Sequence, residues 1–305
     1  MAHSVNINGT LSIGRFDHDA VRQLSAGNYD LVQLVNNGLE WADLEFLSAY
    51  THKIHRLRLG WGVYNSLAGL EKLTELTYLD LDDLPPDPVY DFSSFSNLQV
   101  CKMRWSPKLD QQSFFSLPNL NQVALMWCKT KDCTQIGFAH KLRTLELRFG
   151  VVSSLDGLSN CKSLEELRII RVKGLTSLDE IAKLTHLKTL EIDKGSKFSE
   201  VARSLSQCSN LAEVLLEGDF EITDLEWIRK NARLTRFRSD ATVQNVDWHA
   251  VFNAPALSEI AFAYTPGGLM NDGDIKTIAE SCGKPVRWIE HGGTRRRPWV
   301  EIHFN

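Results

Sequence analysis

Residues 142–147 read LRTLEL, and this pattern of apolar residues at positions 1, 4 and 6 decides the fold because it recurs along the chain. Copies of it begin at residues 31, 54, 76, 98, 120, 142, 164, 187, 211, 234 and 257. Successive copies are 22 to 24 residues apart, a period typical of repeat architectures. Eleven copies at so even a spacing predict a stack of similar units that bury their apolar sides against one another.

Each copy contains two apolar sets with different spacings. Positions 1, 4 and 6 place alternate residues on one side, as in a short strand. A second set follows at positions 14, 17 and 20, which in the copy beginning at residue 76 are Val89, Phe92 and Phe95. A spacing of three predicts a tight helical turn, of the 3₁₀ type, that returns the chain to the next strand.

A repeat of L-x-x-L-x-L at this period resembles the leucine-rich-repeat proteins, in the short 22-residue class of bacterial and phosphatase-regulator members. The resemblance covers residues 30 to 280. It implies an α/β fold, a right-handed solenoid with a parallel β-sheet on the concave face and short helical or 3₁₀ segments on the convex face. The family usually places Asn at position 9 in a hydrogen-bond ladder, whereas this chain has residues such as Gly62, Cys128 and Val172 there. The fold hosts many binding roles and implies no single activity.

The two ends of the chain lack the repeat and predict caps, because the terminal faces of a stack must be covered. Residues 1–30 predict a hairpin around Asn8-Gly9 followed by a helix. Residues 31–280 hold the eleven repeats, and residues 281–305 predict two strands that form a C-terminal β-hairpin. Since no linker separates these parts, we expect a single solenoid domain.

The composition is that of an ordinary globular protein, with 305 residues, 43% hydrophobic residues and a net charge of −4. This charge does not favour a nucleic acid as partner. The sequence contains no apolar run long enough to span a membrane and does not begin like a secretory signal, so we expect no membrane association. Six cysteines without metal-type spacing predict reduced thiols and a cytoplasmic location.

The most informative pattern is the column that position 8 forms in successive repeats. If positions 1, 4 and 6 face the core, the residues between and after them face outward and stack from strand to strand. Large apolar side chains flanked by arginine favour a protein-binding surface. Two other interpretations stay open: the aromatic rings fill the space of the missing asparagines, or they stack and stiffen the sheet. The column and its neighbours at position 7 contain Trp61, Arg104, Trp105, Met126, Trp127, Arg148 and Phe149.

Charged residues alternate in sign at position 5, from Arg58 to Asp80, and from Glu146 to Arg168 to Glu191. They either neutralise one another across strands or select a partner by charge. The cluster of Asp80, Asp82 and Asp83 can face a basic partner or hold a hard cation, and its basic neighbours favour the partner. The predicted partner-binding residues are Trp61, Tyr78, Asp80, Asp82, Asp83, Arg104, Trp105, Met126, Trp127, Arg148, Phe149, Arg168 and Arg171.

No catalytic, metal-binding or cofactor-binding motif is found, neither a P-loop nor a G-x-G-x-x-G turn nor an H-E-x-x-H helix. We therefore expect no enzyme, no metal and no cofactor, and predict a non-catalytic interaction module that binds a protein partner on its concave face. One alternative is a cytosolic bacterial immunity or inhibitor protein that blocks a cognate toxin or enzyme. The other is a substrate-recognition adaptor subunit of an enzyme complex.

Overall fold

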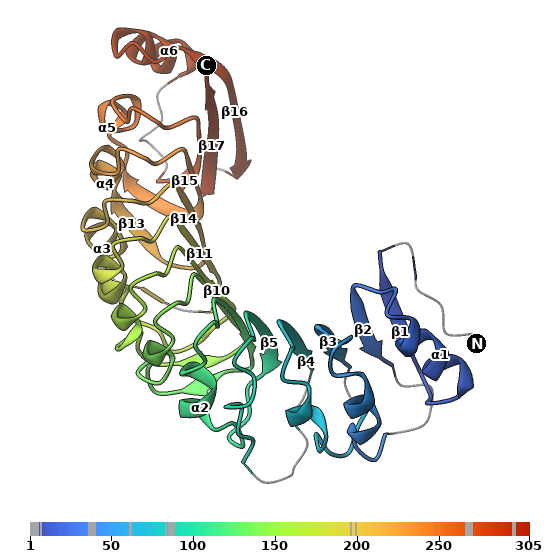
Figure 1. The fold of residues 1–305 in the computed structure, drawn as a ribbon. Helices are drawn as coiled ribbons and strands as arrows, with labels where there is room; N and C mark the ends of the chain where they lie inside the picture. Colours follow the sequence, from blue (N-terminus) through green and yellow to red (C-terminus); the bar gives the residue numbers. More distant parts are fainter. Residues whose placement is uncertain are drawn as a thin grey trace. The chain divides into compact units, whose positions relative to one another are not determined.

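The computed structural model describes residues 6, 8–35, 41–60, 63–82, 84, 89–195, 197–198, 200–265, 271–294 and 297–305. They form two compact units, which we treat separately. Unit 1 comprises Met1–Cys128 and Gln135–Leu142, and unit 2 comprises Lys129–Thr134 and Arg143–Asn305. Both units repeat one motif, a short strand followed by a helical turn (Figure 1).

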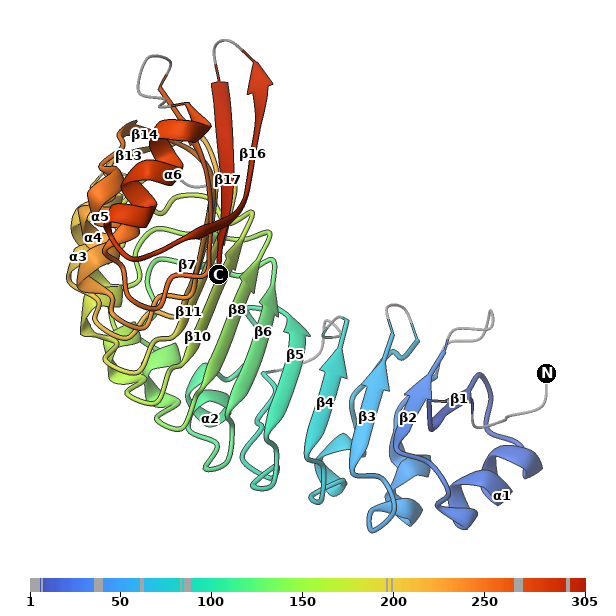
Figure 2. The same cartoon turned by 90° about the horizontal axis from the view of Figure 1, so that it is seen from above.

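The strands of unit 1 lie side by side in chain order and are parallel (Figure 2). Equivalent repeat positions pair in register, so that position 4 of one strand lies beside position 4 of the next, as in the pairs Leu57–Leu79 and Cys101–Val123. Each strand therefore adds the same apolar positions to one continuous core. The strands are β1 (Thr10–Ile13), β2 (Leu31–Leu34), β3 (Arg56–Leu59), β4 (Tyr78–Leu81), β5 (Val100–Arg104) and β6 (Gln122–Met126).

Unit 2 continues the motif and ends in antiparallel strands. Its parallel strands are β8 (Thr144–Arg148), β10 (Glu166–Ile170), β11 (Thr189–Asp193), β12 (Glu213–Glu217), β14 (Arg236–Asn245) and β15 (Glu259–Tyr264). β13 (Glu221–Asp224) also pairs with β14, and β7 (Lys129–Thr130) pairs with β9 (Val151–Val152). β17 (Arg297–Phe304) runs antiparallel to β15, and β16 (Val286–Thr294) runs antiparallel to β17.

The helical turns that follow the strands are short. In Figure 1 the helices α3, α4 and α5 lie along one side of the strands of unit 2. The predicted 3₁₀ turns are present in several repeats, other repeats close with a short α-helix, and residues 89–95, where a 3₁₀ turn was predicted, contain none. The 3₁₀ turns are η1 (Glu45–Tyr50), η2 (Leu70–Lys72), η3 (Ile136–Phe138), η4 (Leu158–Asn160) and η5 (Asp179–Lys183). The α-helices are α1 (His18–Ala26), α2 (Gln111–Phe115), α3 (Val201–Ser206), α4 (Glu226–Lys230), α5 (Trp248–Phe252) and α6 (Asp272–Ser281).

The helix α1 near the N-terminus has defined ends because its flanking residues cap it. The Asp17 side chain accepts hydrogen bonds from the backbone N–H groups of Asp19 and Ala20, both at 3.1 Å. Gly27 ends the helix in the left-handed conformation with φ 69°. The hairpin predicted around Asn8-Gly9 has its first arm in residues 1–5 and 7, outside the described residues. The division into caps and eleven repeats in one domain stays a prediction.

Positions 1, 4 and 6 form the core as predicted, whereas the second apolar set at positions 14, 17 and 20 does so only in part. In the repeat that begins at residue 164 the buried residues are Leu178, Ile181 and Leu184, one position later than predicted. In the repeat that begins at residue 142, Leu142, Leu145 and Leu147 are fully buried. In the repeat that begins at residue 76, Val89 is 62% exposed, contrary to the prediction. The chain there is extended and bridges Leu109 through Tyr90, so Val89 lies outside the turn. Within the described residues, no helix has the length and apolar character needed to cross a bilayer.

Candidate protein-binding surface

In the middle repeats, position 8 lies in a turn that strains the backbone. An L-residue in the left-handed conformation brings its Cβ close to the following carbonyl oxygen, at a cost of roughly 1–2 kcal/mol. Bulky residues are seldom found there, whereas glycine adopts it freely. Four successive repeats nevertheless place a large side chain in this conformation: Trp127 (φ 59°), Phe149 (φ 55°), Arg171 (φ 52°) and Lys194 (φ 44°).

A regular set of backbone hydrogen bonds holds this turn in place. The backbone N–H at position 8 donates to the carbonyl oxygen at position 7 of the next strand. Examples are Trp105 to Met126 at 2.7 Å in unit 1, and Lys194 to Glu217 at 2.7 Å in unit 2. Each strand thereby fixes the end of its neighbour, and the position-8 side chain projects from an ordered turn.

The burial of positions 8 and 9 shows which residue fills the turn. Cys128 and Val172, both at position 9, are fully buried, whereas the position-8 residue Trp127 is 50% exposed. The Trp127 ring therefore does not occupy the space of a missing asparagine. Near the end of unit 2 the column turns inward, because Ala241 and Tyr264 are 0% and 3% exposed. The prediction of an outward column thus holds for Trp127 and not for these two residues.

In unit 1, four predicted residues lie together where β5 and β6 end. Arg104 and Met126 are register partners on the outward face of the sheet. The Arg104 guanidinium lies over the Trp127 ring, 5.9 Å from its centroid, in cation–π geometry. Trp105 and Met126 are partly exposed beside them. We call Arg104, Trp105, Met126 and Trp127 the unit 1 aromatic patch.

In unit 2, the aromatic residue is covered on one side by an arginine. The Arg171 guanidinium lies 5.9 Å from the centroid of the Phe149 ring, and its Nε lies 3.8 Å from Oδ2 of Asp193. Arg148 forms an ion pair with Glu146 of its own strand. The arginines predicted to meet acidic groups of a partner therefore already have acidic neighbours within the chain.

Charges at position 5 pair across strands. Arg168 contacts Glu166 of its own strand, and its guanidinium nitrogens lie 4.0 Å from Glu146 and 3.4 Å from Glu191. In unit 1, Arg58 Nε is 2.9 Å from Asp80 Oδ2. At these residues the ladder is neutralised within the chain, as one of the two interpretations of the sequence expects.

The acidic cluster of unit 1 is joined to a buried tyrosine. Tyr78 donates a hydrogen bond from its hydroxyl to Asp80 at 3.1 Å. Its ring lies between Arg56 and Lys102, at 4.8 and 5.9 Å from the ring centroid. Burial, and to a smaller extent the Asp80 carboxylate, raises the pKa of Tyr78. Asp82 is exposed, while the predicted residues Trp61 and Asp83 lie outside the described residues.

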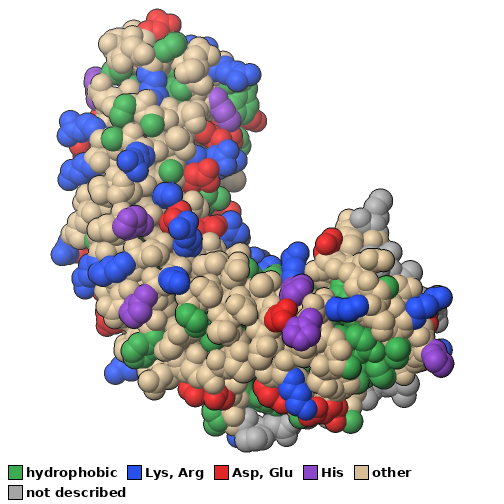
Figure 3. Space-filling model, viewed as in Figure 1, with side chains coloured by type: hydrophobic (Ala, Val, Ile, Leu, Met, Phe, Trp, Pro, Cys, Tyr) green, Lys and Arg blue, Asp and Glu red, His purple; other side chains and the backbone are tan. Residues whose placement is uncertain are grey.

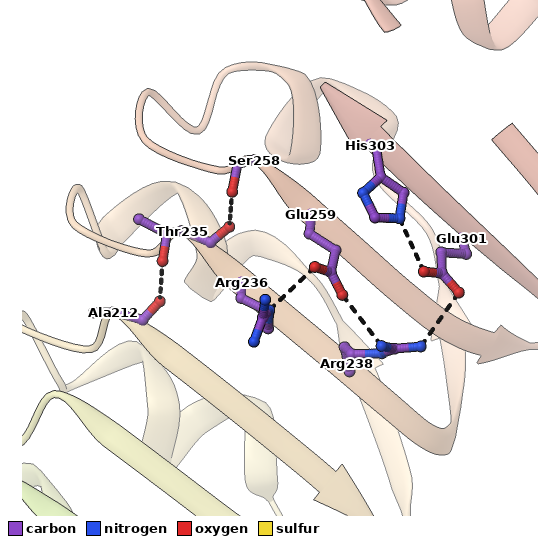
Figure 4. A network of polar contacts seen from close by, with 8 residues as sticks. All are labelled: Ala212, Thr235, Arg236, Arg238, Ser258, Glu259, Glu301 and His303. Atoms are coloured by element: carbon purple, nitrogen blue, oxygen red, sulfur yellow. Dashed lines mark hydrogen bonds and ion pairs between the residues drawn. The ribbon is translucent and has the colours of Figure 1, made fainter. Parts of the chain in front are cut away.

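Unit 2 contains a polar network that the repeat pattern did not reveal (Figure 4). Glu259 accepts from Arg236 at 3.1 Å and lies 3.4 Å from Arg238, which also reaches Glu301 at 3.3 Å. His303 Nε2 lies 2.9 Å from Glu301. Ligand atoms of Glu259, Glu301 and His303 lie within 4.8 Å of one another, a metal-like spacing. Because arginines already occupy both carboxylates, the arrangement is that of a charge network.

The antiparallel strand β17 explains why this network escaped detection. It places Glu301 beside Ala261 and His303 beside Glu259, whereas the repeat pattern aligns only parallel strands. The one signal in the sequence is the pair of basic residues, Arg236 and Arg238, at positions 3 and 5 of the tenth copy.

The cysteines have the properties of packed thiols. All six are free, and five of them are buried. Burial raises the pKa of Cys128, Cys161 and Cys208 to about 12 and that of Cys101 well above its usual range. A thiol with so high a pKa stays protonated at neutral pH and is a poor nucleophile.

Comparisons with known proteins bear on the fold. No protein-family model and no curated protein sequence matches the chain. Among solved structures, the internalin InlF of Listeria monocytogenes matches with a TM-score of 0.50 and 18% identity, over 82% of this chain and 85% of that one. TLR13, in its complex with single-stranded RNA, matches with a TM-score of 0.55 and 18% identity, over 75% of this chain and 35% of that one.

The chain has the leucine-rich-repeat fold. A leucine-rich-repeat protein of Leptospira interrogans also matches, at 14% identity over 81% of each chain and with a TM-score of 0.41. The leucine-rich-repeat assignment confirms the predicted fold class. In the structure, Trp105, Trp127 and Phe149 directly follow β5, β6 and β8.

Proposed function

We propose that this leucine-rich-repeat chain is a non-catalytic module that binds a protein partner through the outward face of its sheet. Its anchors are Trp105 and Trp127 in unit 1, together with Met126, and Phe149 in unit 2. The observation that carries the proposal is the left-handed backbone at Trp127 and Phe149, combined with the exposure of the Trp127 ring.

The strain at position 8 supports a role for the side chains themselves. Glycine fits this turn without the Cβ contact. A tryptophan there costs backbone energy and leaves half of its surface in water. Since strained residues cluster where their side chains act on a ligand, Trp127 and Phe149 are the favoured contact residues.

The arginines beside the rings support anchoring further. Arg104 over Trp127 and Arg171 over Phe149 restrict the rings before a partner arrives. A ring that is already ordered loses less conformational entropy on binding. Aromatic and arginine side chains are also the types that contribute most to protein–protein affinity.

The distribution of charge favours a protein over a nucleic acid. The TLR13 structure is a complex with single-stranded RNA. In this chain, however, Arg148, Arg168 and Arg171 lie next to carboxylates, which lowers their attraction for phosphate. Both acidic and basic side chains occur on the face seen in Figure 3.

The cysteines support the predicted cellular context. Six free thiols suit a reducing compartment such as the cytoplasm. Protonated, buried thiols also support a non-catalytic role. The two narrower roles, inhibitor of a cognate toxin or enzyme and adaptor subunit of an enzyme complex, remain predictions that the identity of the partner will separate.

The test is affinity capture with the tagged wild-type chain and two variants. We expect Trp127→Ala to lose a partner that the wild type captures, with little change in melting temperature. Phe138→Ala is the matched control, because Phe138 is also a partly exposed aromatic residue of unit 1 but lies in η3. Equal capture by all three proteins, or a Trp127→Ala variant that fails to fold, argues against anchoring by Trp127. Incubating the immobilised chain with labelled single-stranded RNA tests the nucleic-acid alternative.

A further inference from the structure

A second site lies in unit 2, away from the position-8 aromatic residues. A cavity of about 590 Å³ opens on the outward face of the sheet, over β12, β14, β15 and β17. Its floor consists of Ala261 and Ala263, which are small enough to leave a recess between larger neighbours. Leu215 lines one side and Trp299 the other.

The position of Trp299 depends on small residues on both of its neighbouring strands. It pairs with Ala263 of β15 and with Gly292 of β16. A Cβ on Gly292 would lie 2.3 Å from Cζ2 of the Trp299 ring, so the ring lies over the Gly292 backbone. The indole therefore forms a fixed apolar wall of the cavity.

Two arginines that line the cavity are already held by acceptors. Arg238 reaches across Ala261 to Glu301 at 3.3 Å, and it also contacts Glu259. Arg297 crosses β15 in the opposite direction and donates to the carbonyl oxygen of Asp240. Both guanidinium groups thus tie β17 to the repeats and have little capacity left for an anionic ligand.

The charge that lacks a partner is negative. The lining holds three carboxylates, on Glu217, Asp240 and Glu301, and two guanidinium groups, so one negative charge is in excess. Asp240 accepts a hydrogen bond from Gly218 N–H at 2.7 Å, and Glu301 is held by Arg238. In the described part of the chain, the Glu217 carboxylate has neither a hydrogen bond nor an ion pair. Asp193, its register partner, already has Arg171 beside it at 3.8 Å, so the excess negative charge lies on Glu217.

We propose that this cavity receives a basic side chain, arginine or lysine, of the protein partner. The aliphatic part of that side chain packs on Ala261, Ala263 and Leu215 beside the Trp299 ring. Its cationic end meets Glu217, the unpaired carboxylate at the rim. A long side chain with an apolar stem and a cationic end suits this cavity, because the stem leaves water against the apolar lining and the cationic end forms a charge-assisted contact with Glu217. That the basic side chain belongs to a protein partner rests on the proposed function, whereas the affinity of the cavity for such a side chain does not.

The test uses the full chain and blocked tripeptides with one variable central residue. Binding is followed by NMR through the indole N–H signal of Trp299, which is assigned by its loss in Trp299→Phe. We expect a saturable shift with a central arginine or lysine, and a weaker effect as salt is added, since the contact with Glu217 lies at the surface. A central norleucine, of similar apolar length without the charge, binds less tightly.

Two variants and one control locate the contact. Glu217→Gln raises the Kd of the arginine peptide about three- to fivefold, the range of a solvent-exposed ion pair. Ala261→Leu fills the floor and abolishes binding. Glu213→Gln makes the same change on the same strand outside the cavity and leaves the Kd unchanged. The proposal is overturned by equal affinity for norleucine, by preference for a central glutamate, by no saturable shift or by an unaffected Glu217→Gln. These results need no partner, so they stand apart from the capture experiment with Trp127→Ala.

Discussion

The guanidinium of Arg104 lies 5.9 Å from the ring centroid of Trp127, on the strand that precedes it in the sheet of unit 1. Two features thus restrict the orientation of the Trp127 ring: Arg104 lies over the ring, and the Trp127 backbone adopts the left-handed conformation. A side chain held in this way presents a defined apolar surface to a partner.

The first prediction concerns the coupling between these two residues. Once a partner is captured, Arg104→Gln should weaken its binding, because the ring loses its cation–π neighbour. In the background of Trp127→Ala, the same change should cost less, with a coupling energy of roughly 0.5–1 kcal/mol. Titration calorimetry of the four proteins measures this cycle. Strictly additive losses would show that Arg104 and Trp127 act independently.

The second prediction isolates the backbone strain at Trp127. Of two variants that both remove the ring, Trp127→Gly should be more stable than Trp127→Ala by about 1 kcal/mol, because only alanine retains a Cβ in the left-handed turn. At Ala124, within β6, the order should reverse: Ala124→Gly should be less stable than the wild type by roughly 0.5–1 kcal/mol. Urea unfolding measures each difference. An alanine variant as stable as the glycine variant would remove the strain argument.

The third prediction compares two glycines in the left-handed conformation, of which only Gly157 begins a 3₁₀ turn. Gly157 precedes η4 with φ 90°, and a Cβ there would lie 2.5 Å from the Cα of Thr134. Gly283 is also left-handed, with φ 69°, but a Cβ on it would meet nothing within 4 Å. Gly157→Ala should therefore destabilise the protein by clearly more than the ~1 kcal/mol expected for strain alone, and Gly283→Ala by about that amount. Equal losses in urea unfolding would mean that the turn moves to accommodate the methyl group.

Much of this architecture follows from the sequence, for a physical reason. Apolar periodicity reports which side chains leave water, and it placed the repeated strands correctly. It was less accurate for the turns, as Val89 is exposed and the turn that begins at Leu178 lies one position later than predicted. It also gave the register, because equivalent positions pair in parallel strands. Backbone torsion angles give no comparable pattern in the sequence. The residues around Trp127 do not indicate that its φ is positive.

Contacts across the antiparallel strand were equally hidden. The cavity beside Trp299 and the network of Arg238 with Glu259 and Glu301 depend on the pairing of β15 with β17, which lies outside the repeat. The sequence showed the charged residues at position 5, but their ion pairs depend on side-chain conformations that only the structure gives. Arg168, predicted to face a partner, proved to lie among three carboxylates of its own chain.

The fourth prediction follows from that position of Arg168. Arg168→Met removes the charge that separates Glu146, Glu166 and Glu191, so their mutual repulsion should lower stability. The Arg168 side chain is 40% exposed, so screening limits the loss to about 1 kcal/mol or less. The loss should shrink when salt is added. Urea midpoints at low and high ionic strength test this, and a loss independent of salt would point to packing by the aliphatic part of the side chain.

The last prediction concerns alkaline pH. Burial raises the pKa of Cys128, Cys161 and Cys208 from 9.0 to about 12. Between these two values the unfolded chain releases thiol protons that the folded chain keeps, so the unfolded state is favoured increasingly as pH rises. The stabilising contribution is fully present below pH 9.0 and is lost toward pH 12. Tyr29, whose pKa is raised to about 12 chiefly by burial, acts in the same direction above pH 10.

The measurement is the urea midpoint at pH ~8 and pH ~10.5, for the wild type and for Cys161→Ala. The variant should be less stable at the lower pH, because it leaves a small cavity where the sulfur was. Its further loss on going to the higher pH should nevertheless be smaller than that of the wild type, since one titrating thiol is gone. An identical loss in both proteins would show that the Cys161 thiol ionises alike in the folded and unfolded states, and that other groups cause the alkaline sensitivity.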